Sequence, residues 1–482
     1  MMQQRRADNT MTRTPAPDDP RPAPQPGSSI HSCSGATSVR AHMRFHHLPD
    51  DDAQCAWYAM LPEPPPASRL EGAHSADWIV LGGGLTGLAA ARRLAMLRPQ
   101  SRIALIEAQR IGYGAAGRNS GFMIDLPHHL NSHSYTGRLE ADRRLIRRNR
   151  AAIDYLRDIV HGHAIECDWR EQGKIHAAAT NAGAAALAAF MQGLDRLDEP
   201  YTQLDRQQLA DTTGTDYYVA GMHTPGTVLV QPAALMRGLA RSLPENVQVY
   251  ENSPALSLST GNDTVRVQCR QGHIEAGGLI LATNSFAGQL GLLRGRIIPV
   301  STYASMTPPL TADQQTQLGR DSGWGLIPAN PIGTTLRRVQ GDRLLVRNTF
   351  LHTPAFRTTP AQRRAVHRRH QQCLQARYPE LAEAGLEYTW GGVLGASRNA
   401  QPYFGRFARG IYAAVCHNGL GLADGTIAGK LIAELACGED NPLLREMLAD
   451  KSMPARNPPK PLTTLGVRCQ LLWKQWRAGR EI

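Results

Sequence analysis

Three glycines near residue 85 have the spacing of a loop that binds a pyrophosphate. Gly82, Gly84 and Gly87 form the pattern G-x-G-x-x-G. The first glycine permits a tight turn, the second lets the backbone approach the phosphates, and the third lets a helix pack closely on the preceding strand. The free amides of Leu85 and Thr86, at the positive end of that helix, would face the phosphates.

An acidic residue follows these glycines at the distance expected of a ribose-binding carboxylate. Glu107 lies about 20 residues after the last glycine, at the end of the next apolar segment. A carboxylate there accepts hydrogen bonds from ribose hydroxyls and repels a 2'-phosphate, which disfavours NADP. The pattern therefore predicts a dinucleotide site. The simpler alternative is a glycine turn and a surface glutamate in an ordinary α/β protein.

A second glycine-dense loop favours FAD over NAD as the dinucleotide. Residues 111–121 read I-G-Y-G-A-A-G-R-N-S-G and directly follow the acidic residue. Such a loop can pass the pyrophosphate and reach an isoalloxazine ring, whereas simple doubly wound NAD dehydrogenases usually continue with a helix.

The elements needed to position these residues can be read on both sides of them. Residues 78–81 form a short apolar run, residues 85–97 have helical spacing, and residues 102–108 are typical of a buried strand. Further helices are expected at 142–160, 182–197, 232–243, 361–378 and 425–437, and strands at 247–250, 264–270, 278–282, 343–348, 386–394 and 410–415. This alternation predicts an α/β core with an inserted sheet domain.

Six segments carry a resemblance to a known family. They are A-W-Y-A-M-L-P-E-P-P-P (56–66), D-W-I-V-L-G-G-G-L-T-G-L-A-A-A (77–91), G-Y-G-A-A-G-R-N-S-G (112–121), W-G-G (390–392), P-Y-F-G-R (402–406) and H-N-G-L-G-L-A-D-G-T-I-A-G-K-L-I-A-E-L (417–435). With these segments the chain resembles the D-amino-acid-oxidase-like (DAO) family of FAD oxidoreductases, and within it the gamma-glutamylputrescine oxidase type. The resemblance spans roughly residues 56–438.

The resemblance implies an α/β fold of two domains. One is a glutathione-reductase-like Rossmann domain that binds FAD, assembled from residues 43–125, 225–300 and 386–440. The other is a mixed-sheet substrate domain built from residues 126–224 and 301–385, which covers the flavin. We expect residues 1–42, rich in Pro, Ser, Asp and Arg, to be a disordered extension, and residues 441–482 to be a basic tail beyond a globular part that ends near Gly438.

The resemblance also implies roles for individual residues around the cofactor. The three glycines and Glu107 would hold the ADP half of FAD. The flavin would be lined by Gly117, Arg118, Asn119 and Gly121. The second FAD-domain strand would end at Ala282 and Thr283. The pyrimidine edge of the ring would lie beside Gly419, Gly421 and Leu422. The helix expected at 425–437 would favour the negative charge of reduced flavin at its N-terminus. The simpler interpretation of residues 417–421 is a glycine-rich turn before a core helix.

Two departures from the family pattern bear on cofactor and substrate. The family's flavin loop often has Ala-Ser-Gly-Arg-Asn, whereas Ala116 here lacks the serine hydroxyl. The gamma-glutamylputrescine oxidase pattern has Asn-Arg-Ala-Pro after W-G-G, whereas here Asn399 is followed by Ala400, Gln401 and Pro402. Arg398 would then substitute for the missing arginine, and the exact substrate is left open.

The chemistry implied is oxidation of a carbon–nitrogen bond in a small amine or amino acid. Flavin-dependent amine oxidation needs a neutral amine held with its α-hydrogen near flavin N5, so positioning matters most and a base is not compulsory. His417 is the candidate catalytic residue, with a structural hydrogen bond as its alternative. Arg337 or Arg398 would bind a substrate carboxylate through a bidentate pair.

Three functional hypotheses remain open from the sequence. The first is an oxidase that forms an imine, releases the hydrolysed product and reoxidises its non-covalent FAD with O2, with a gamma-glutamylputrescine-like amine as the favoured substrate. The second is a dehydrogenase at a membrane surface that passes electrons to quinone. The third is a flavin-binding protein without catalytic activity.

Composition excludes other classes of protein. The chain has 482 residues, of which 42% are hydrophobic, and a formal net charge of +12. Its eight cysteines form no C-x-x-C pair, which argues against a metal site and for a reducing, cytoplasmic setting. No nucleic-acid-binding motif accompanies the positive charge, so anionic substrates or a membrane surface are the expected partners.

The C-terminal tail has the composition of a basic helix. Leu465, Cys469, Leu472 and Trp476 recur at helical spacing, among basic residues. Two interpretations remain: an interfacial helix that brings the protein to the inner face of a membrane, or a helix docked on its own domain or on a partner subunit.

Overall fold

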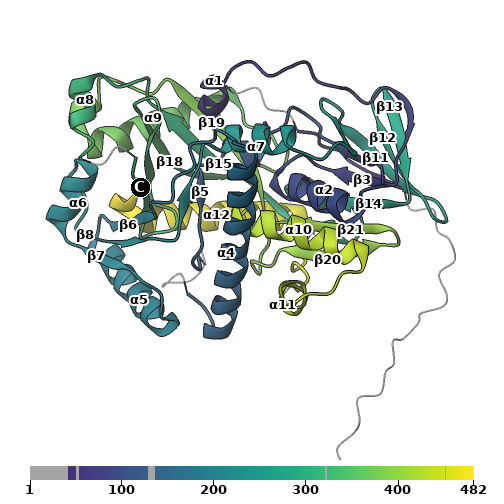
Figure 1. The fold of residues 1–482 in the computed structure, drawn as a ribbon. Helices are drawn as coiled ribbons and strands as arrows, with labels where there is room; N and C mark the ends of the chain where they lie inside the picture. The colour runs from purple at the N-terminus through teal and green to yellow at the C-terminus, as the bar shows by residue number, and fades with distance from the viewer. Residues whose placement is uncertain (1–41, 50–53, 129–135, 321–322, 451) are drawn as a thin grey trace, which may run out of the picture. The chain divides into compact units, whose positions relative to one another are not determined.

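The predicted strand–helix–strand unit forms at the glycine motif. Strand β3 (Trp78–Leu81), helix α2 (Leu85–Leu97) and strand β4 (Ile103–Ile106) follow one another. Figure 1 labels β3 and α2. They are seen in a computed structural model that describes residues 42–49, 54–128, 136–320, 323–450 and 452–482. The extension expected at residues 1–42 lies outside the described residues except for its last residue.

This unit belongs to a six-stranded sheet of order β10-β4-β3-β14-β21-β20. Neighbouring strands are parallel except β20 and β21, which are antiparallel. The carboxyl ends of the parallel strands therefore lie at one edge, where open α/β sheets bind ligands. The added strands are β10 (Val247–Tyr250), β14 (Gly278–Leu281), β21 (Ile411–Val415) and β20 (Tyr403–Ala408).

Both faces of the six-stranded sheet are covered, which explains its continuous apolar runs. Val80 and Ile280 pack with residues of α2 and of helix α10 (Ala423–Cys437) on one face. Ile79 and Leu279 pack on the other face, against a five-stranded sheet of order β1-β11-β12-β13-β2. The strands of this second sheet are β1 (His42–Arg44), β11 (Ala255–Thr260), β12 (Val265–Cys269), β13 (Gly272–Ala276) and β2 (Gly72–Ser75).

An eight-stranded mixed sheet forms the other part of the fold. Its order is β19-β15-β18-β17-β16-β6-β8-β7, and only β16 and β6 pair in parallel among its strands as described. Leu344 and Val346 of this sheet pack against Leu374 of helix α9 (Pro360–Arg377). The strands are β19 (Tyr388–Ala396), β15 (Ile298–Met306), β18 (Arg343–His352), β17 (Thr335–Val339), β16 (Gly325–Pro328), β6 (Lys174–Ala178), β8 (Ala220–Thr224) and β7 (Thr202–Leu204).

The predicted α/β class with a mixed-sheet part is confirmed. The division of the chain into segments remains a proposal, because β19 lies within the segment 386–440 assigned to the cofactor domain and yet pairs with β15 in the eight-stranded sheet. The remaining elements are α1 (Ala56–Ala59), α3 (Ala115–Arg118), α4 (Leu139–Gly162), α5 (Asn181–Leu197), α6 (Arg206–Thr213), α7 (Pro232–Arg241), α8 (Ala312–Thr316), β5 (Phe122–Met123), β9 (Val228–Leu229) and short 3-10 turns at 284–289, 291–293, 379–381 and 479–481.

The prediction that the globular part ends near Gly438 is wrong. Helix α11 (Pro442–Asp450) is tied to α4 by ion pairs from Arg144 and Arg148 to Asp450. Helix α12 (Lys460–Ala478), yellow in Figure 1, follows. The carboxylate of Glu481 is buried and accepts hydrogen bonds from the Thr180 amide and hydroxyl at the start of α5. The tail is thus part of the fold, held by the ion pairs of α11 and by one buried acid in an otherwise basic segment.

Candidate active site

A cavity of about 1300 Å³ connects the two large sheets. Its walls include the residues that directly follow β3, β4, β14 and β21, and residues of β15, β18 and β19. Pockets for drug-sized ligands measure roughly 300–1,000 Å³. The cavity therefore has room for a dinucleotide and for a second, smaller molecule.

The three motif glycines occupy positions that larger residues would disrupt or fill. Gly82 has a φ of +109°, and a Cβ on Gly87 would lie 1.7 Å from the Gly82 carbonyl oxygen. Gly84 differs, because its nearest neighbour would be the Ala116 Cβ at 3.6 Å and the space beyond is open cavity. Gly82, Gly84, Leu85 and Thr86 line the cavity, whereas Gly87 serves helix packing outside it.

Glu107 lies where the sequence predicts it, at the carboxyl end of β4, and lines the cavity. Its Oε2 accepts a hydrogen bond from the Gly83 amide at 2.7 Å, and its Oε1 accepts one from the Gln109 amide at 3.0 Å. Burial raises the pKa of this carboxyl, and the two amide donors oppose that shift. The carboxyl group is thereby fixed in the position expected of a ribose-binding group.

The second glycine-dense loop is held against the eight-stranded sheet. Arg118 Nε donates to the Gly391 carbonyl at 2.6 Å, and Trp390 Nε1 donates to the Arg118 carbonyl at 2.9 Å. Asn119 Oδ1 accepts from the Gly121 amide at 2.8 Å. Arg118 and Asn119 line the cavity. Outside it, Gly117 packs against the backbone of Gly112, and Gly121 packs against Arg337 and the Val230 carbonyl.

The loop that follows β14 presents three polar side chains to the cavity. Thr283, Asn284 and Ser285 line the cavity directly after Ala282. Their side-chain oxygens are buried and have no hydrogen-bond partner among the described residues. Buried polar groups are normally satisfied, so these three oxygens indicate a polar ligand. Ala282 and Thr283 were predicted here, whereas Asn284 and Ser285 were missed because nothing in their local pattern marks them.

His417 connects the N-termini of two helices beside the cavity. Its Nδ1 lies 2.9 Å from Asp424 Oδ2 in the first turn of α10, and its Nε2 lies 3.1 Å from Thr86 Oγ1 in the first turn of α2. Cys416 and Asn418, on either side, have φ angles of +68° and +52°. Such left-handed backbone costs about 1–3 kcal/mol per residue and is found at ligand sites. Both imidazole nitrogens are therefore engaged in positioning, and a direct catalytic role for His417 stays a prediction.

The turn after His417 offers backbone to the cavity. Gly419, Gly421 and Leu422 all line it. A Cβ on Gly421 would meet no atom within 4 Å, and Gly419 has a φ of +90°. This open backbone precedes the N-terminus of α10, which attracts negative charge.

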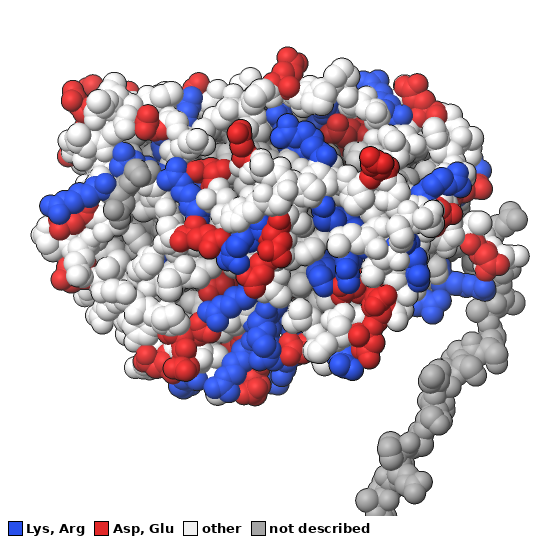
Figure 2. Space-filling model, in the orientation of Figure 1, with Lys and Arg blue, Asp and Glu red and all other residues white. Residues whose placement is uncertain are grey.

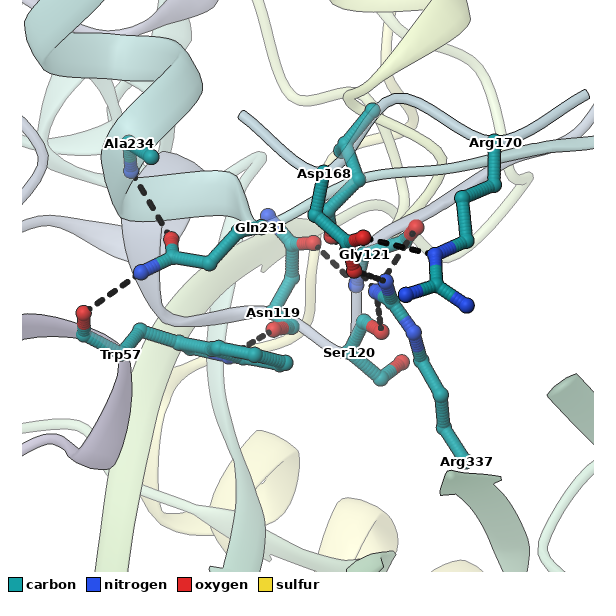
Figure 3. Close-up of polar contacts among 10 residues, drawn as sticks. Trp57, Asn119, Ser120, Gly121, Asp168, Arg170, Gln231, Ala234 and Arg337 are labelled. Carbon is teal, nitrogen blue, oxygen red and sulfur yellow. Dashed lines mark hydrogen bonds and ion pairs between the residues drawn. The ribbon is translucent and has the colours of Figure 1, made fainter. Parts of the chain in front are cut away.

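Arg337 does not line the cavity, which contradicts its predicted role in binding a substrate carboxylate. Its guanidinium donates to the carbonyl oxygen of Val230 at 2.5 Å and pairs with Asp168 at 3.3 Å (Figure 3). It also lies over the ring of Trp57. Burial lowers the pKa of Arg337 to about 10, and Asp168 opposes the shift. Arg337 also donates a hydrogen bond to the Ser120 carbonyl of the flavin loop.

Where the eight-stranded sheet and α12 form the wall of the cavity, the lining cations include two that the sequence did not single out. Arg347 lies on β18 opposite Thr335 and Ala304, in the middle of the eight-stranded sheet. Lys474 reaches the cavity from α12. The predicted Arg398 also lines the cavity, from an exposed position after β19. Lateral pairing between distant strands brings Arg347 here, which local patterns do not reveal.

The site fits FAD, and the comparison with known families decides the assignment. The profile of the family described as FAD dependent oxidoreductase (DAO) matches residues 77–435. The chain belongs to this family. DAO-family FAD oxidoreductases are enzymes, and the predictions of the family, the enzyme class and the FAD cofactor are confirmed.

Curated relatives are similar along most of their length. A probable oxidoreductase OrdL of Haemophilus influenzae is 26% identical over 400 residues, covering 79% of this chain and 86% of the relative. The gamma-glutamylputrescine oxidoreductase of Escherichia coli is 25% identical over 386 residues, covering 78% and 86%.

Solved structures show the same fold. Glycine oxidase from Geobacillus kaustophilus superposes with a TM-score of 0.64 at 20% identity, covering 76% of this chain and 96% of that one. Iminodiacetate oxidase from Chelativorans sp. BNC1 gives a TM-score of 0.61 at 18% identity, covering 78% and 100%. At these identities the likeness concerns the fold alone.

Three parts of the cavity wall are suited to hold FAD. The glycine turn and Glu107 suit the ADP half, the three oxygens after β14 suit its polar linker, and the backbone at 419–422 suits the ring. None of the described cysteines lines the cavity. Cys416 is buried, and burial raises its pKa to about 12, so it is a poor nucleophile for covalent attachment.

Proposed function

We propose that this DAO-family enzyme oxidises the carbon–nitrogen bond of a small amine that also has a carboxylate, with a gamma-glutamyl derivative of a diamine as the favoured substrate. Such a molecule has a free amine at one end and a carboxylate at the other. The imine formed would hydrolyse to an aldehyde and ammonia, and O2 would be reduced to hydrogen peroxide.

The observation that supports this substrate most directly is the position of Arg347. Its cationic side chain lines the cavity from β18, the third strand of the eight-stranded sheet, between β15 and β17. Lys474 adds a second cation to the same wall. A guanidinium matches a carboxylate with two parallel hydrogen bonds. The E. coli relative, named for gamma-glutamylputrescine, agrees with this substrate class.

The protein's own contribution is positioning. Bound FAD would supply the redox chemistry, by accepting a hydride at N5 from the carbon next to nitrogen and passing electrons to an acceptor. Arg347 would fix the carboxylate end and thereby the distance of the amine from the cofactor. The N-terminus of α10, oriented by His417, would stabilise negative charge that develops at the ring.

The acceptor is the second part of the proposal. We favour O2 as the acceptor, and a quinone is the alternative that contact of the basic tail with a membrane would allow. No helix among the described residues is long and apolar enough to span a membrane. Oxygen consumption during turnover distinguishes the two acceptors. A purely structural flavin site is the remaining alternative, and absence of reduction by every amine tested would favour it.

The test combines a substrate panel with two arginine variants. Arg347→Gln should raise KM for amines with a carboxylate and leave KM for simple alkyl amines unchanged. Arg398→Gln is the matched control, because Arg398 is exposed at the cavity. Arg398→Gln should keep the wild-type KM values, and the carboxylate proposal fails if Arg347→Gln keeps them too. If the wild type reduces its flavin with no amine, the oxidation itself fails.

A further inference from the structure

Helix α12 exposes a stripe of large apolar side chains. The stripe consists of residues that are between 53% and 78% exposed, namely Leu462, Leu465, Leu472, Trp473 and Trp476. At about 100° per residue, their spacing places all five within one arc about 100° wide. Large apolar residues are seldom gathered in this way on a surface without a partner.

The opposite face of α12 is already occupied by its own protein. Ala478 is buried, and Leu471 packs with Val300 and Phe350 of the eight-stranded sheet. Gln475 Nε2 donates to the Phe350 carbonyl at 3.4 Å. Thr463, Val467 and Lys474 line the cavity, as does Leu462 at the N-terminal end of the stripe. The helix is thus fixed by one face, and the other four residues of the stripe lie on the opposite face.

Basic residues flank the stripe. Arg468 and Arg477 lie on its two sides by helical spacing, and Lys460 and Arg480 lie near its ends. From residue 451 onward the sole acidic residue is Glu481, which is buried. By contrast, arginines of α4 pair with acidic residues, such as Arg147 with Glu446, and Figure 2 shows positive and negative side chains mixed on the face that it displays. The stripe's surroundings therefore complement a negatively charged surface.

We propose that α12 docks flat on an anionic lipid membrane, with the stripe in the interface and the flanking basic residues at the headgroups. Tryptophan and leucine on one face with Lys and Arg beside them suit this environment. A second copy of the chain fits less well, because a two-fold contact through the stripe would bring two sets of basic residues into one interface, and the segment has no exposed acidic residue to pair with them. Docking would set the cavity wall formed by α12 beside the bilayer. This inference does not depend on the identity of the substrate.

The test is flotation of the FAD-loaded full chain with vesicles of phosphatidylcholine alone or mixed with phosphatidylglycerol. Binding is expected only to the anionic vesicles, and it should weaken as salt rises. Arg468→Gln with Arg477→Gln should reduce affinity about thirtyfold, because each basic residue near an anionic surface contributes about fivefold. Leu472→Ser, Trp473→Ser and Trp476→Ser together should abolish binding.

The control replaces exposed apolar residues outside the stripe, Met96→Ser with Leu448→Ser, and should bind like wild type. Flavin absorbance verifies that each variant is folded. The proposal is overturned if the wild type fails to bind anionic vesicles, or if the stripe variant binds as well as wild type. It is also overturned if sedimentation shows a dimer that only the stripe variant loses, since a second copy would then cover the stripe.

Discussion

The two ends of the cavity are built on different principles. At the end proposed to bind the cofactor, loops that follow neighbouring parallel strands present mainly backbone, with glycine where space is required. At the end proposed to bind the substrate, the wall is formed by side chains from β15, β18 and α12, which are far apart in sequence and are joined by lateral pairing and packing. A site made of backbone requires particular residue types at few positions, so it appears in the sequence as a motif. A site made of side chains can be built from many residue types, so we expect the substrate specificity to be determined at the second end.

The largest effect is expected from filling the cofactor end. Gly84→Leu should lower FAD affinity at least about a hundredfold, equivalent to about 2.7 kcal/mol, because the new side chain would project into open cavity. Its backbone has a φ of −80°, which leucine adopts readily. The unfolding temperature of the FAD-free protein should stay near that of wild type. Titration with FAD and thermal melts measure both.

Gly87→Ala is the matched comparison for that variant. Its Cβ would overlap the Gly82 carbonyl oxygen, so it should lower the unfolding temperature of the FAD-free protein itself. If Gly84→Leu were equally destabilising, or if it bound FAD normally, the assignment of the cofactor end would be contradicted.

The next effect concerns the substrate end. Arg347→Gln should raise KM for carboxylate-bearing amines about tenfold to a hundredfold, because a hydrogen bond to a charged group contributes about 1.5–3 kcal/mol. FAD affinity should not change. Steady-state kinetics and FAD titration separate the two ends. An equal loss of FAD from this variant would show that the ends are not independent.

A smaller, pH-dependent effect is expected from Lys474. Burial lowers the pKa of its ammonium below the ordinary value for lysine. Only the protonated form attracts a carboxylate, so a non-oxidisable carboxylate inhibitor should bind more weakly as pH rises through that lowered pKa. The inhibition constant against pH measures this. Lys474→Gln should bind the inhibitor more weakly at neutral pH and lose this part of the pH dependence, and an unchanged profile would argue against contact with the carboxylate.

The smallest effect should come from restoring the hydroxyl at position 116. Ala116 lines the cavity beside Gly84. Ala116→Ser should change FAD affinity by no more than about tenfold, since one net hydrogen bond contributes about 0.5–1.5 kcal/mol. Fluorescence titration with FAD tests this, with Ala116→Val as a bulkier control that should weaken binding.

The contrast between the two ends also explains what the sequence could predict. The strand and helix at 78–97 and the acid at 107 form a local pattern, and each lies as predicted. Arg337 was misjudged because a buried arginine that ties backbone carbonyls together cannot be distinguished from a ligand-binding one by residue type. Arg347 was missed because its position depends on pairing across β17, β18 and β15.

The tail shows the same limit. The apolar spacing of α12 predicted a helix with an exposed or docked face, and the structure shows one face docked and the other exposed. Nothing local indicated that Glu481 would accept hydrogen bonds from Thr180, the N-cap residue of α5, about 300 residues earlier in the chain. This contact is one of those that join the tail to the rest of the fold.

The central claim is best tested by anaerobic reduction of the purified enzyme's visible flavin absorption with a matched pair of amines, one with a distal carboxylate and one without. We predict that the wild type is bleached by the carboxylate-bearing amine at far lower concentration, that Arg347→Gln loses this preference, and that admitting air restores the colour if O2 is the acceptor. A protein that stays colourless with added FAD, or a flavin that no amine reduces, would contradict the account.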